Sequence, residues 1–415
     1  MLVTGTFDWT DVEFDLSDVN FVTDREAGER WTGAPRPVCP GRFSDGNDVY
    51  VVTRYEAVRG LFADRRVSNH PPEGVHLDSM RRRGVPEELL KYFDSTIMTM
   101  VPEDHRRVRS LIDRAFSVRR VKTLRPRIEL LADELLDRMD AEGEADLVAE
   151  YAHPISTTVI CELLGVDDEY RDQWLKWAEA FTTFVRPDPV ILPPALRGMV
   201  DTVTRLIGAR RARPGDDLIS DLVQASDETE KLDEVELVAL VLVLVQAGLD
   251  TVRHSISLSV FNLLTHPDQL ELVKAHPENT VRAVRELMRY SGPIKMALPR
   301  FATEPIEVDG VTIPKDGQIQ LVVGAANNDP ERFTDPRVLD VTRTDNPQLS
   351  FAAGDHFCPG ASLATAETEI ALNKLFARFP DVRLTADPDE VGPRFLKAVT
   401  RLPVRLANPA SDAPA

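Results

Sequence analysis

The sequence predicts a mainly α-helical fold with a small β region, and three features carry this prediction. Between about residues 85 and 290, apolar residues recur at the three- and four-residue spacing of amphipathic helices. Residues 306–313 alternate around an Asp-Gly pair, as in a β-hairpin, and a long helix is expected over residues 361–376. The chain contains no internal repeat and no linker rich in Gly and Ser. We therefore predict one domain over residues 1–407, followed by a flexible tail over residues 408–415.

The remaining elements follow in chain order. Residues 49–52 form a strand candidate, and residues 55–62 form a short helix candidate. A helix is predicted over residues 126–143, because it starts with a proline, which is favoured at the first helical position, and ends at a glycine. Residues 70–100 and 186–194 show little periodicity and are expected to be long loops.

Composition restricts the class of protein. The net charge of −19 over 415 residues argues against binding of a nucleic-acid backbone. The three cysteines, Cys39, Cys161 and Cys358, lie far apart and form neither a disulfide framework nor a paired metal motif, which fits a reducing cytosol. No signal peptide is evident, and the longest apolar run, residues 237–245, is shorter than the roughly 20 residues that span a bilayer. We expect a cytoplasmic protein that does not enter a membrane.

One cysteine stands in an unusual setting. Cys358 follows Gly354 and His356 and precedes Gly360, directly before the helix expected from residue 361. A thiol at a helix N-terminus is favoured as a thiolate, and glycines allow a flat ligand to approach the backbone. Cys39 begins the same Cys-Pro-Gly tripeptide but is expected to precede a strand. From these residues alone, Cys358 is either a metal ligand or a buried structural cysteine.

Three further patterns combine charged or polar residues on helices. The apolar stretch after residue 236 continues into Ala247, Gly248, Leu249, Asp250 and Thr251, so that an acid and an alcohol follow two small residues. Glycine inside a helix costs about 1 kcal/mol relative to alanine, so a packing or ligand-binding reason is expected. The alternative is a core helix that approaches its end.

The other two patterns place charges on one helical face. Glu286 and Arg289 are three residues apart, and His105 and Arg109 are four apart, so each pair shares a face. His105 and Arg109 could together bind a carboxylate. Solvated surface pairs are the alternative for both patterns.

In this order and at these spacings, the patterns resemble the cytochrome P-450 family. Residues 351–360 are similar to the family's haem loop, Phe-Gly-x-Gly-x-His-x-Cys-x-Gly, except that Ala352 occupies a position where the family usually has glycine. The resemblance implies a helical prism around a buried haem b, with Cys358 as the axial thiolate ligand to iron.

The resemblance also implies a role for each matching residue. Asp250 and Thr251 would deliver protons on the distal side of the haem, where Ala247 and Gly248 leave room for O2. Glu286, Arg289 and Arg343 would form a structural triad. The resemblance implies cofactor-binding roles for His105, Arg109, Ala247, Gly248, Arg300, His356, Cys358 and Gly360.

The implied activity is a monooxygenase that inserts one oxygen atom from O2 into a small organic substrate of bacterial secondary metabolism. Electrons would come from NAD(P)H through a separate ferredoxin reductase and ferredoxin. In the family a basic side of the protein faces the electron donor, and the matching candidates are Arg106, Arg107, Arg114, Arg119 and Arg120.

Alternatives remain open on sequence alone. The same haem site could serve aryl coupling, nitration or desaturation, or the chain could be a haem-binding sensor without catalysis. A cysteine hydrolase that uses Cys358 and His356 is disfavoured, because residues two positions apart in a loop are not arranged as nucleophile and base.

Family analogy places substrate contacts at Ile294, Lys295, Met296 and Leu396. Lys295 is the unusual member, because the family tends to keep this stretch apolar. It could pair with a substrate carboxylate, or it could be a surface lysine whose stem packs against the protein.

Overall fold

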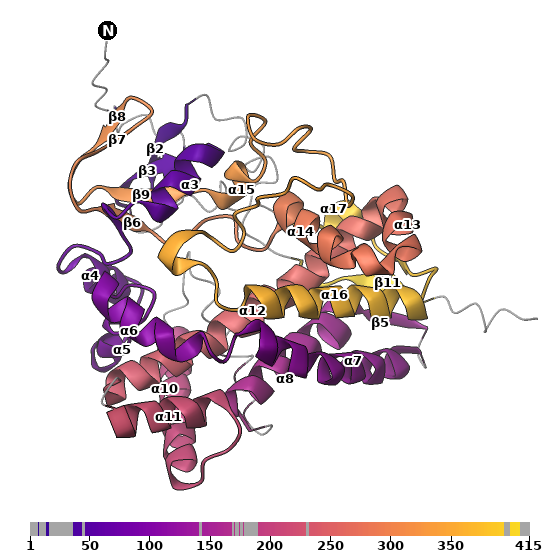
Figure 1. The fold of residues 1–415 in the computed structure, drawn as a ribbon, viewed down its shortest axis with the longest axis horizontal. Coiled ribbons are helices and arrows are strands. Elements are labelled where there is room, and N and C mark those ends of the chain that lie inside the picture. Colours follow the sequence, from indigo (N-terminus) through magenta and orange to yellow (C-terminus); the bar gives the residue numbers. More distant parts are fainter. Residues whose placement is uncertain are drawn as a thin grey trace, which may run out of the picture.

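The computed structural model describes residues 7, 14–15, 36–43, 46–140, 143–167, 170, 174, 177, 190–229, 232–393 and 399–406. Helices dominate, and most strands lie at one corner, with β5 (Glu144–Asp146) and β11 (Pro403–Arg405) on the opposite side (Figure 1), which confirms the predicted mainly α class. The predicted tail over residues 408–415 and the substrate residue Leu396 lie outside the described residues.

The helices are as follows: α3 (Tyr55–Ala63), α4 (Val75–Arg82), α5 (Leu90–Asp94), α6 (Pro102–Ile112), α7 (Val118–Asp140), α8 (His153–Leu164), α10 (Leu192–Ala212), α11 (Leu218–Thr229), α12 (Glu234–Thr265), α13 (Pro267–Ala275), α14 (Thr280–Ser291), α15 (Val323–Ala326), α16 (Ala361–Arg378) and α17 (Pro388–Val391). Short 3-10 turns are η1 (Glu87–Leu89), η4 (Pro277–Asn279) and η5 (Gly354–His356), and η2 (Val148–Ala152) is a π-helical turn.

The strands are β1 (Phe14–Asp15), β2 (Val38–Arg42), β3 (Asp48–Val52), β4 (Val67–Ser68), β5 (Glu144–Asp146), β6 (Arg300–Ala302), β7 (Ile306–Val308), β8 (Val311–Ile313), β9 (Gln318–Leu321), β10 (Arg383–Leu384) and β11 (Pro403–Arg405). The largest sheet has the order β1-β2-β3-β9-β6-β4, and β10, β11 and β5 form a second sheet. The predicted hairpin is β7–β8, whose Asp309 and Gly310 have φ of 48° and 80°. Both residues adopt the left-handed conformation that such two-residue turns require.

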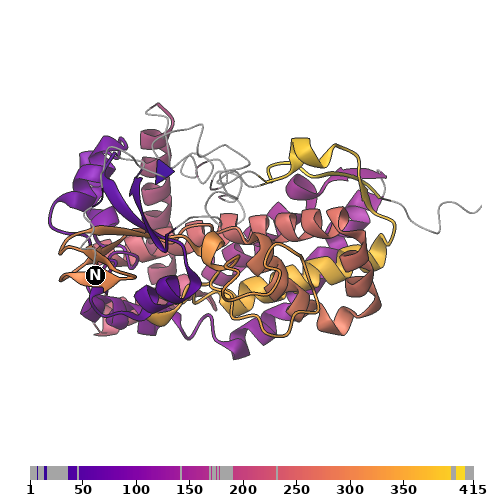
Figure 2. The ribbon, with the colours of Figure 1, turned by 90° about the horizontal axis from the view of Figure 1, so that it is seen from above.

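Helix α12 runs through the middle of the helical part (Figure 2). It begins with a capping box, in which Asp233 and Glu236 each accept a hydrogen bond from the other's backbone N–H. It packs against α8, α14 and α16, which explains why it is apolar on nearly all sides. By length and composition α12 could also cross a bilayer, but half of its most apolar stretch is buried inside the protein.

Three sequence predictions about local structure were wrong in whole or in part. Residues 192–194 of the loop expected over residues 186–194 belong to α10, and residues 186–189 lie outside the described residues. Helix α7 begins at Val118 and contains Pro126 in its interior, because Val121 is buried and Leu124 packs against the core. Residues 70–100 are not one long loop but contain α4, η1 and α5. These elements are only eight, three and five residues long, so each has too few turns to leave a clear periodicity in the sequence.

A buried ion pair joins α14 to the chain that precedes residue 351. Glu286 and Arg289 are almost completely buried, and their side chains lie 2.7 Å apart. Arg343 approaches Glu286 to 3.2 Å, and Arg289 donates to the carbonyls of Asn327 and Pro336 at 2.9 and 2.7 Å. A charge buried without partners is strongly unfavourable, so this network ties the irregular segment to α14.

Candidate active site

One cavity of about 430 Å³ collects most of the polar residues that the sequence singled out. It lies between α6, α12, α16 and the segment that joins α14 to β6. The candidate residues that line it are His105, Arg109, Ala247, Gly248, Thr251, Ile294, Met296, Arg300, His356, Cys358 and Gly360.

Cys358 reaches this cavity from the turn before α16. Its N–H donates to the carbonyl of Phe351 at 2.9 Å, which closes the loop. Burial raises the pKa of the Cys358 thiol, and the backbone N–H groups of Gly360 and Ala361 only partly offset this effect. The unliganded thiol therefore keeps its proton, and a metal that binds there must displace it.

No group of three or more His, Cys, Asp or Glu side chains in the described part of the chain could hold a metal ion. A metal at Cys358 would therefore have to bring its other ligands with it. An iron porphyrin would meet this requirement, because the macrocycle supplies four ligands and the iron can still bind the sulfur.

One edge of the cavity is cationic. Arg300 is buried, rests 4.8 Å from the ring centre of Phe62, and has no acidic partner among the described residues. Burial lowers the pKa of Arg300 to about 10. The rings of His105 and His356 lie 4.1 Å apart, and burial, together with the charges of His105, Arg300 and Arg109, lowers the pKa of His356 to about 3. A carboxylate at this edge would balance these charges, so the residues present fit the propionates of a haem.

Helix α12 supplies another wall. Gly248 lies where α8 comes closest, since a Cβ at this position would stand 2.4 Å from Cγ1 of Ile160. Thr251 lines the cavity and donates its hydroxyl to the carbonyl of Ala247 at 2.7 Å. Gly248 therefore allows α12 to approach α8 closely, and Ala247 and Gly248 together leave open space in the cavity near the thiol loop.

Asp250 is not among the lining residues. Its carboxylate pairs with Arg253 and His254 on its own helix, and the contact with His254 is 3.4 Å. Burial alone would raise the pKa of Asp250, but His254 and Arg253 outweigh burial and the pKa is lowered. Sequence reasoning missed both partners, although their spacing of three and four residues was visible.

Sequence reasoning also missed Glu367. This glutamate of α16 is 3% exposed, lines the cavity, and has a buried Oε2 without a hydrogen-bond partner among the described residues. Burial raises the pKa of Glu367 well above its usual value and favours the protonated form. The signal was an acid on the same helical face as the apolar Leu363 and Ile370.

The structure places only some of the predicted substrate residues at the cavity. Ile294 and Met296 line the cavity. Lys295 does not; its stem packs against Gly324, with Cδ 3.2 Å from the position of a Cβ there. Lys295 is half-buried and has no ion pair among the described residues, and burial lowers the pKa of its ammonium to about 8.

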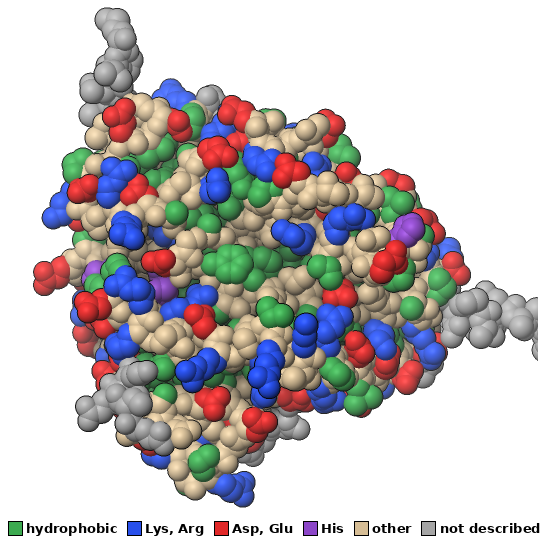
Figure 3. Space-filling model, viewed as in Figure 1, with side chains coloured by type: hydrophobic (Ala, Val, Ile, Leu, Met, Phe, Trp, Pro, Cys, Tyr) green, Lys and Arg blue, Asp and Glu red, His purple; other side chains and the backbone are tan. Residues whose placement is uncertain are grey.

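The predicted basic patch is smaller than the sequence indicated. Arg107 pairs with Glu236 and Asp104, and Arg120 approaches Asp216. Arg106, Arg114 and Arg119 remain exposed. Glu236 and Asp216, which partly offset the charges of Arg107 and Arg120, lie far from them in sequence, so one helix considered alone does not reveal these two contacts. On the face seen in Figure 3, Lys and Arg side chains surround a central hydrophobic patch. Phe357, the residue before Cys358, is hydrophobic, and 47% of its surface is exposed.

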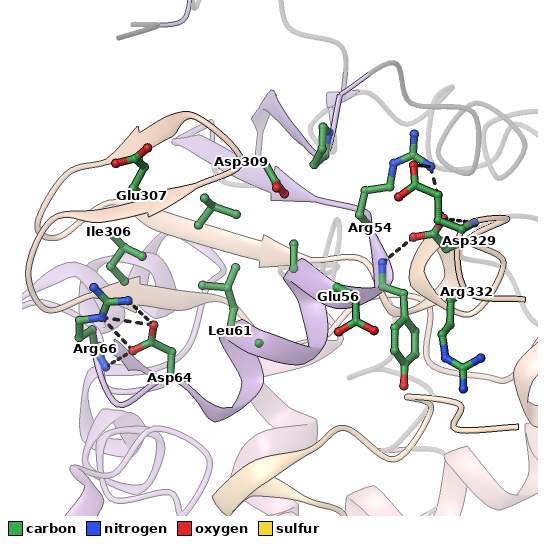
Figure 4. Close-up of a pocket in the computed structure, with 16 residues that line it drawn as sticks. Arg54, Glu56, Leu61, Asp64, Arg66, Ile306, Glu307, Asp309, Asp329 and Arg332 are labelled. Atoms are coloured by element: carbon green, nitrogen blue, oxygen red, sulfur yellow. Dashed lines mark hydrogen bonds and ion pairs between the residues drawn. The ribbon is translucent and has the colours of Figure 1, made fainter. Parts of the chain in front are cut away.

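A second pocket lies between α3 and the β7–β8 hairpin, with a volume of about 540 Å³ (Figure 4). Its arginines are paired: Arg54 with Asp329, and Arg66 with Asp64. Arg332 pairs with Asp345, which lies outside the pocket. Glu307 and Asp309 also line this pocket and make it acidic. None of the candidate residues lines this pocket, and its charge does not suit an anionic cofactor.

Comparison with known proteins gives a consistent result. The family model described as Cytochrome P450 matches residues 48–400. The chain is 40% identical over 377 residues to 6-deoxyerythronolide B hydroxylase of Saccharopolyspora erythraea, covering 89% of this chain and 93% of that protein. It is 36% identical to the polyketide biosynthesis cytochrome P450 PksS of Bacillus subtilis, covering 88% and 91%.

Solved structures agree with the sequence relatives. The PksS structure matches with a TM-score of 0.85 at 32% identity, covering 95% of this chain and 100% of that one. The epothilone D-bound cytochrome P450epoK matches with a TM-score of 0.84 at 30% identity, covering 95% and 99%.

The cysteine loop allows a stability prediction. Ala352 has a φ of 61°, a left-handed conformation that a side chain disfavours. Ala352→Gly should raise the free energy of unfolding by about 0.5–1 kcal/mol. Gly354→Ala should lower it by about 2 kcal/mol, because Gly354 has a φ of 70° and its Cβ would lie 2.6 Å from the carbonyl oxygen of Phe62. Urea denaturation measures both; equal effects of the two variants would contradict this account.

Lys295 allows a prediction of pH dependence. Its pKa is about 8 in the folded protein against 10.5 ordinarily, so the folded state disfavours the charged amine at neutral pH. Lys295→Met should therefore raise the free energy of unfolding at pH 7 by about 1–2 kcal/mol. Between pH 8 and 10.5 the unfolded chain binds more protons than the folded one, so this gain should shrink. A gain that stays constant over this range in urea denaturation would show that the ammonium carries no such penalty.

Proposed function

Because the chain belongs to the cytochrome P450 family, we propose that it is a haem-thiolate monooxygenase of bacterial secondary metabolism that uses the cavity around Cys358. One observation carries the proposal: the Cys358 thiol, the small-residue stretch of α12 and Arg300, which is buried without an acidic partner among the described residues, line the same cavity. The net reaction inserts one oxygen atom of O2 into a C–H bond, while the other leaves as water. It consumes two electrons and two protons.

Haem b would be held by the Cys358 sulfur and by the cationic edge. Arg300, His105, Arg109 and His356 would bind its propionates through charge-assisted hydrogen bonds. When bound, the haem supplies an iron at which O2 is bound and its O–O bond is cleaved, and thiolate ligation favours that cleavage.

The chain's own contribution to the reaction is proton transfer and exclusion of water. The hydroxyl of Thr251 lies within the cavity and can pass a proton from its Oγ1. Asp250, whose lowered pKa keeps it ionised, would take up protons from the solvent side, with Arg253 and His254 holding its carboxylate. Glu367, whose raised pKa favours its protonated form, is a second proton donor. The acid and alcohol together favour O2 activation over aryl coupling, nitration or a sensor role.

The electrons would come from NAD(P)H through a ferredoxin reductase and a ferredoxin in the cytoplasm. The exposed Arg106, Arg114 and Arg119, together with Phe357, would form the docking face, because ferredoxins of this kind are acidic. Charge complementarity of this type mainly accelerates association, so reduction should slow at high salt.

The substrate would be a largely apolar natural product, and a polyketide is the class that the relatives' names favour. Apolar side chains from three segments line the cavity: Ile97 and Met98, Val243 and Leu244, and Ile294 and Met296. Screening of natural-product compounds for shifts in the haem Soret band would identify the substrate.

A reduced carbon-monoxide spectrum tests the proposed function. Wild-type protein supplied with haem should give the spectral signature of a thiolate-ligated iron, and Cys358→Ser should lose it. Cys39→Ala is the matched control, because Cys39 is buried within β2 and should not affect the spectrum. A folded wild-type protein without the thiolate signature would refute the proposal.

The role of Thr251 has its own test. Thr251→Ala should lower product formation per NADPH consumed by at least about ten-fold, with peroxide released instead, because the hydroxyl no longer passes protons. Thr251→Ser keeps the hydroxyl and should retain most of the coupling. Product formed with labelled O2 and peroxide are measured side by side. Unchanged coupling in Thr251→Ala would remove this residue from the proton path.

A further inference from the structure

The cavity contains one buried polar side chain that none of these roles uses. Ser255 bonds Thr368 at 2.9 Å, and Ser350 donates to the carbonyl of Met288 at 2.8 Å, so both serines are satisfied within the protein. The proposed function already uses the other polar residues, either to bind haem (His105, His356, Arg109, Arg300 and Cys358) or to transfer protons (Thr251 and Glu367). The remaining polar side chain that lines the cavity, among the described residues, is Asn69.

Asn69 leaves an acceptor in the cavity unpaired. The side chain is 7% exposed, and its Nδ2 donates to the carbonyl of Met98 at 3.2 Å. Because a carbonyl can only accept, this bond determines which way the amide is turned. Oδ1 is then buried with no hydrogen-bond partner among the described residues. A buried amide oxygen without a donor is unfavourable, so a donor from a ligand would be favoured there.

The sheet places Asn69 at the cationic edge of the cavity. Strands β4 and β6 are antiparallel, with Ser68 opposite Phe301, so the next residue, Asn69, lies beside Arg300. The haem propionates at this edge would be balanced by Arg300 and Arg109, so a buried ammonium group beside the neutral Asn69 amide would lack a counter-charge of its own. A neutral hydroxyl or amide N–H carries no such penalty.

We infer that Oδ1 of Asn69 accepts a hydrogen bond from a neutral hydroxyl or amide N–H of the substrate at the Arg300 edge of the cavity. The inference rests on the proposed function and narrows the substrate class. The substrate is an apolar molecule that carries an uncharged donor, and this donor fixes its orientation over the haem. A site built around such an acceptor discriminates against an analogue that lacks the donor.

Asn69 has a second contact that a test must separate from this role. Its bond to Met98, like the bond between His70 Nδ1 and the carbonyl of Thr99 at 2.9 Å, holds residues 98–99 against the end of β4. Asn69→Leu removes both the acceptor and this attachment. Asn69→Asp keeps an acceptor but cannot donate to Met98, and His70→Phe breaks only the neighbouring attachment.

The experiment uses haem-loaded full-length protein whose thiolate signature has first been verified, which separates this test from that of the proposed function. The probes are 4-phenylimidazole, which binds the iron through its nitrogen, and its three hydroxyphenyl isomers, which direct a hydroxyl to different parts of the cavity. Titration of the Soret band gives the Kd of each probe for wild type and for the three variants.

Wild type should bind at least one hydroxyphenyl isomer about ten-fold more tightly than 4-phenylimidazole. Asn69→Asp and His70→Phe should keep this preference, and Asn69→Leu should lose it. The inference is overturned if wild type prefers none of the isomers or if the preference survives in Asn69→Leu. It is equally overturned if Asn69→Asp and Asn69→Leu lose the preference alike, because Asn69 would then act only by holding residues 98–99.

Discussion

The buried carboxylate of Glu286 is the constraint on which the site depends. It has no contact with solvent, and it is satisfied by Arg289 from its own helix and by Arg343 and Asn346 from the irregular segment. Separating the segment from α14 would take Arg343 and Asn346 away from a carboxylate in a low-dielectric interior and leave it with Arg289 alone, so the separation is unfavourable. The same segment continues into the loop that carries Cys358. A long stretch without regular structure is thereby held well enough to position a metal ligand.

Burial shifts the pKa values of two groups in the cavity in opposite directions. It raises the pKa of the Cys358 thiol, and it lowers the pKa of Arg300, a cation without an acidic partner among the described residues. A metal that binds sulfur and a carboxylate that binds the guanidinium would remove both penalties. A haem would carry both groups on one rigid, flat molecule, so its binding would offset the burial of the Arg300 charge and replace the proton of Cys358 by iron.

The two carboxyl groups near the reaction centre differ through their surroundings. Asp250 lies beside Arg253 and His254, which hold it ionised, whereas Glu367 is surrounded by apolar atoms and keeps its proton. Environments that separate the pKa values of two acids allow one to take up protons while the other releases them. In the proposed enzyme, Asp250 would relay protons from solvent, whereas Glu367 would carry a proton that solvent replaces after each turnover.

The sequence alone determined the fold class, the cysteine and the small-residue stretch of α12, because helical periodicity and short motifs are local properties. Helical spacing also indicated His105 and Arg109 as a pair that could bind a carboxylate, whereas Arg300 and His356 were indicated only through the family resemblance. The tertiary structure decided what distant segments do to one another. Examples are the pairing of Arg107 with Glu236 and the burial of Glu367, and, within the described part of the chain, the lack of an acidic partner for Arg300 and of a donor for Oδ1 of Asn69. Each of these depends on desolvation or on a charge from another element. The identity of a residue and of its sequence neighbours reveals neither.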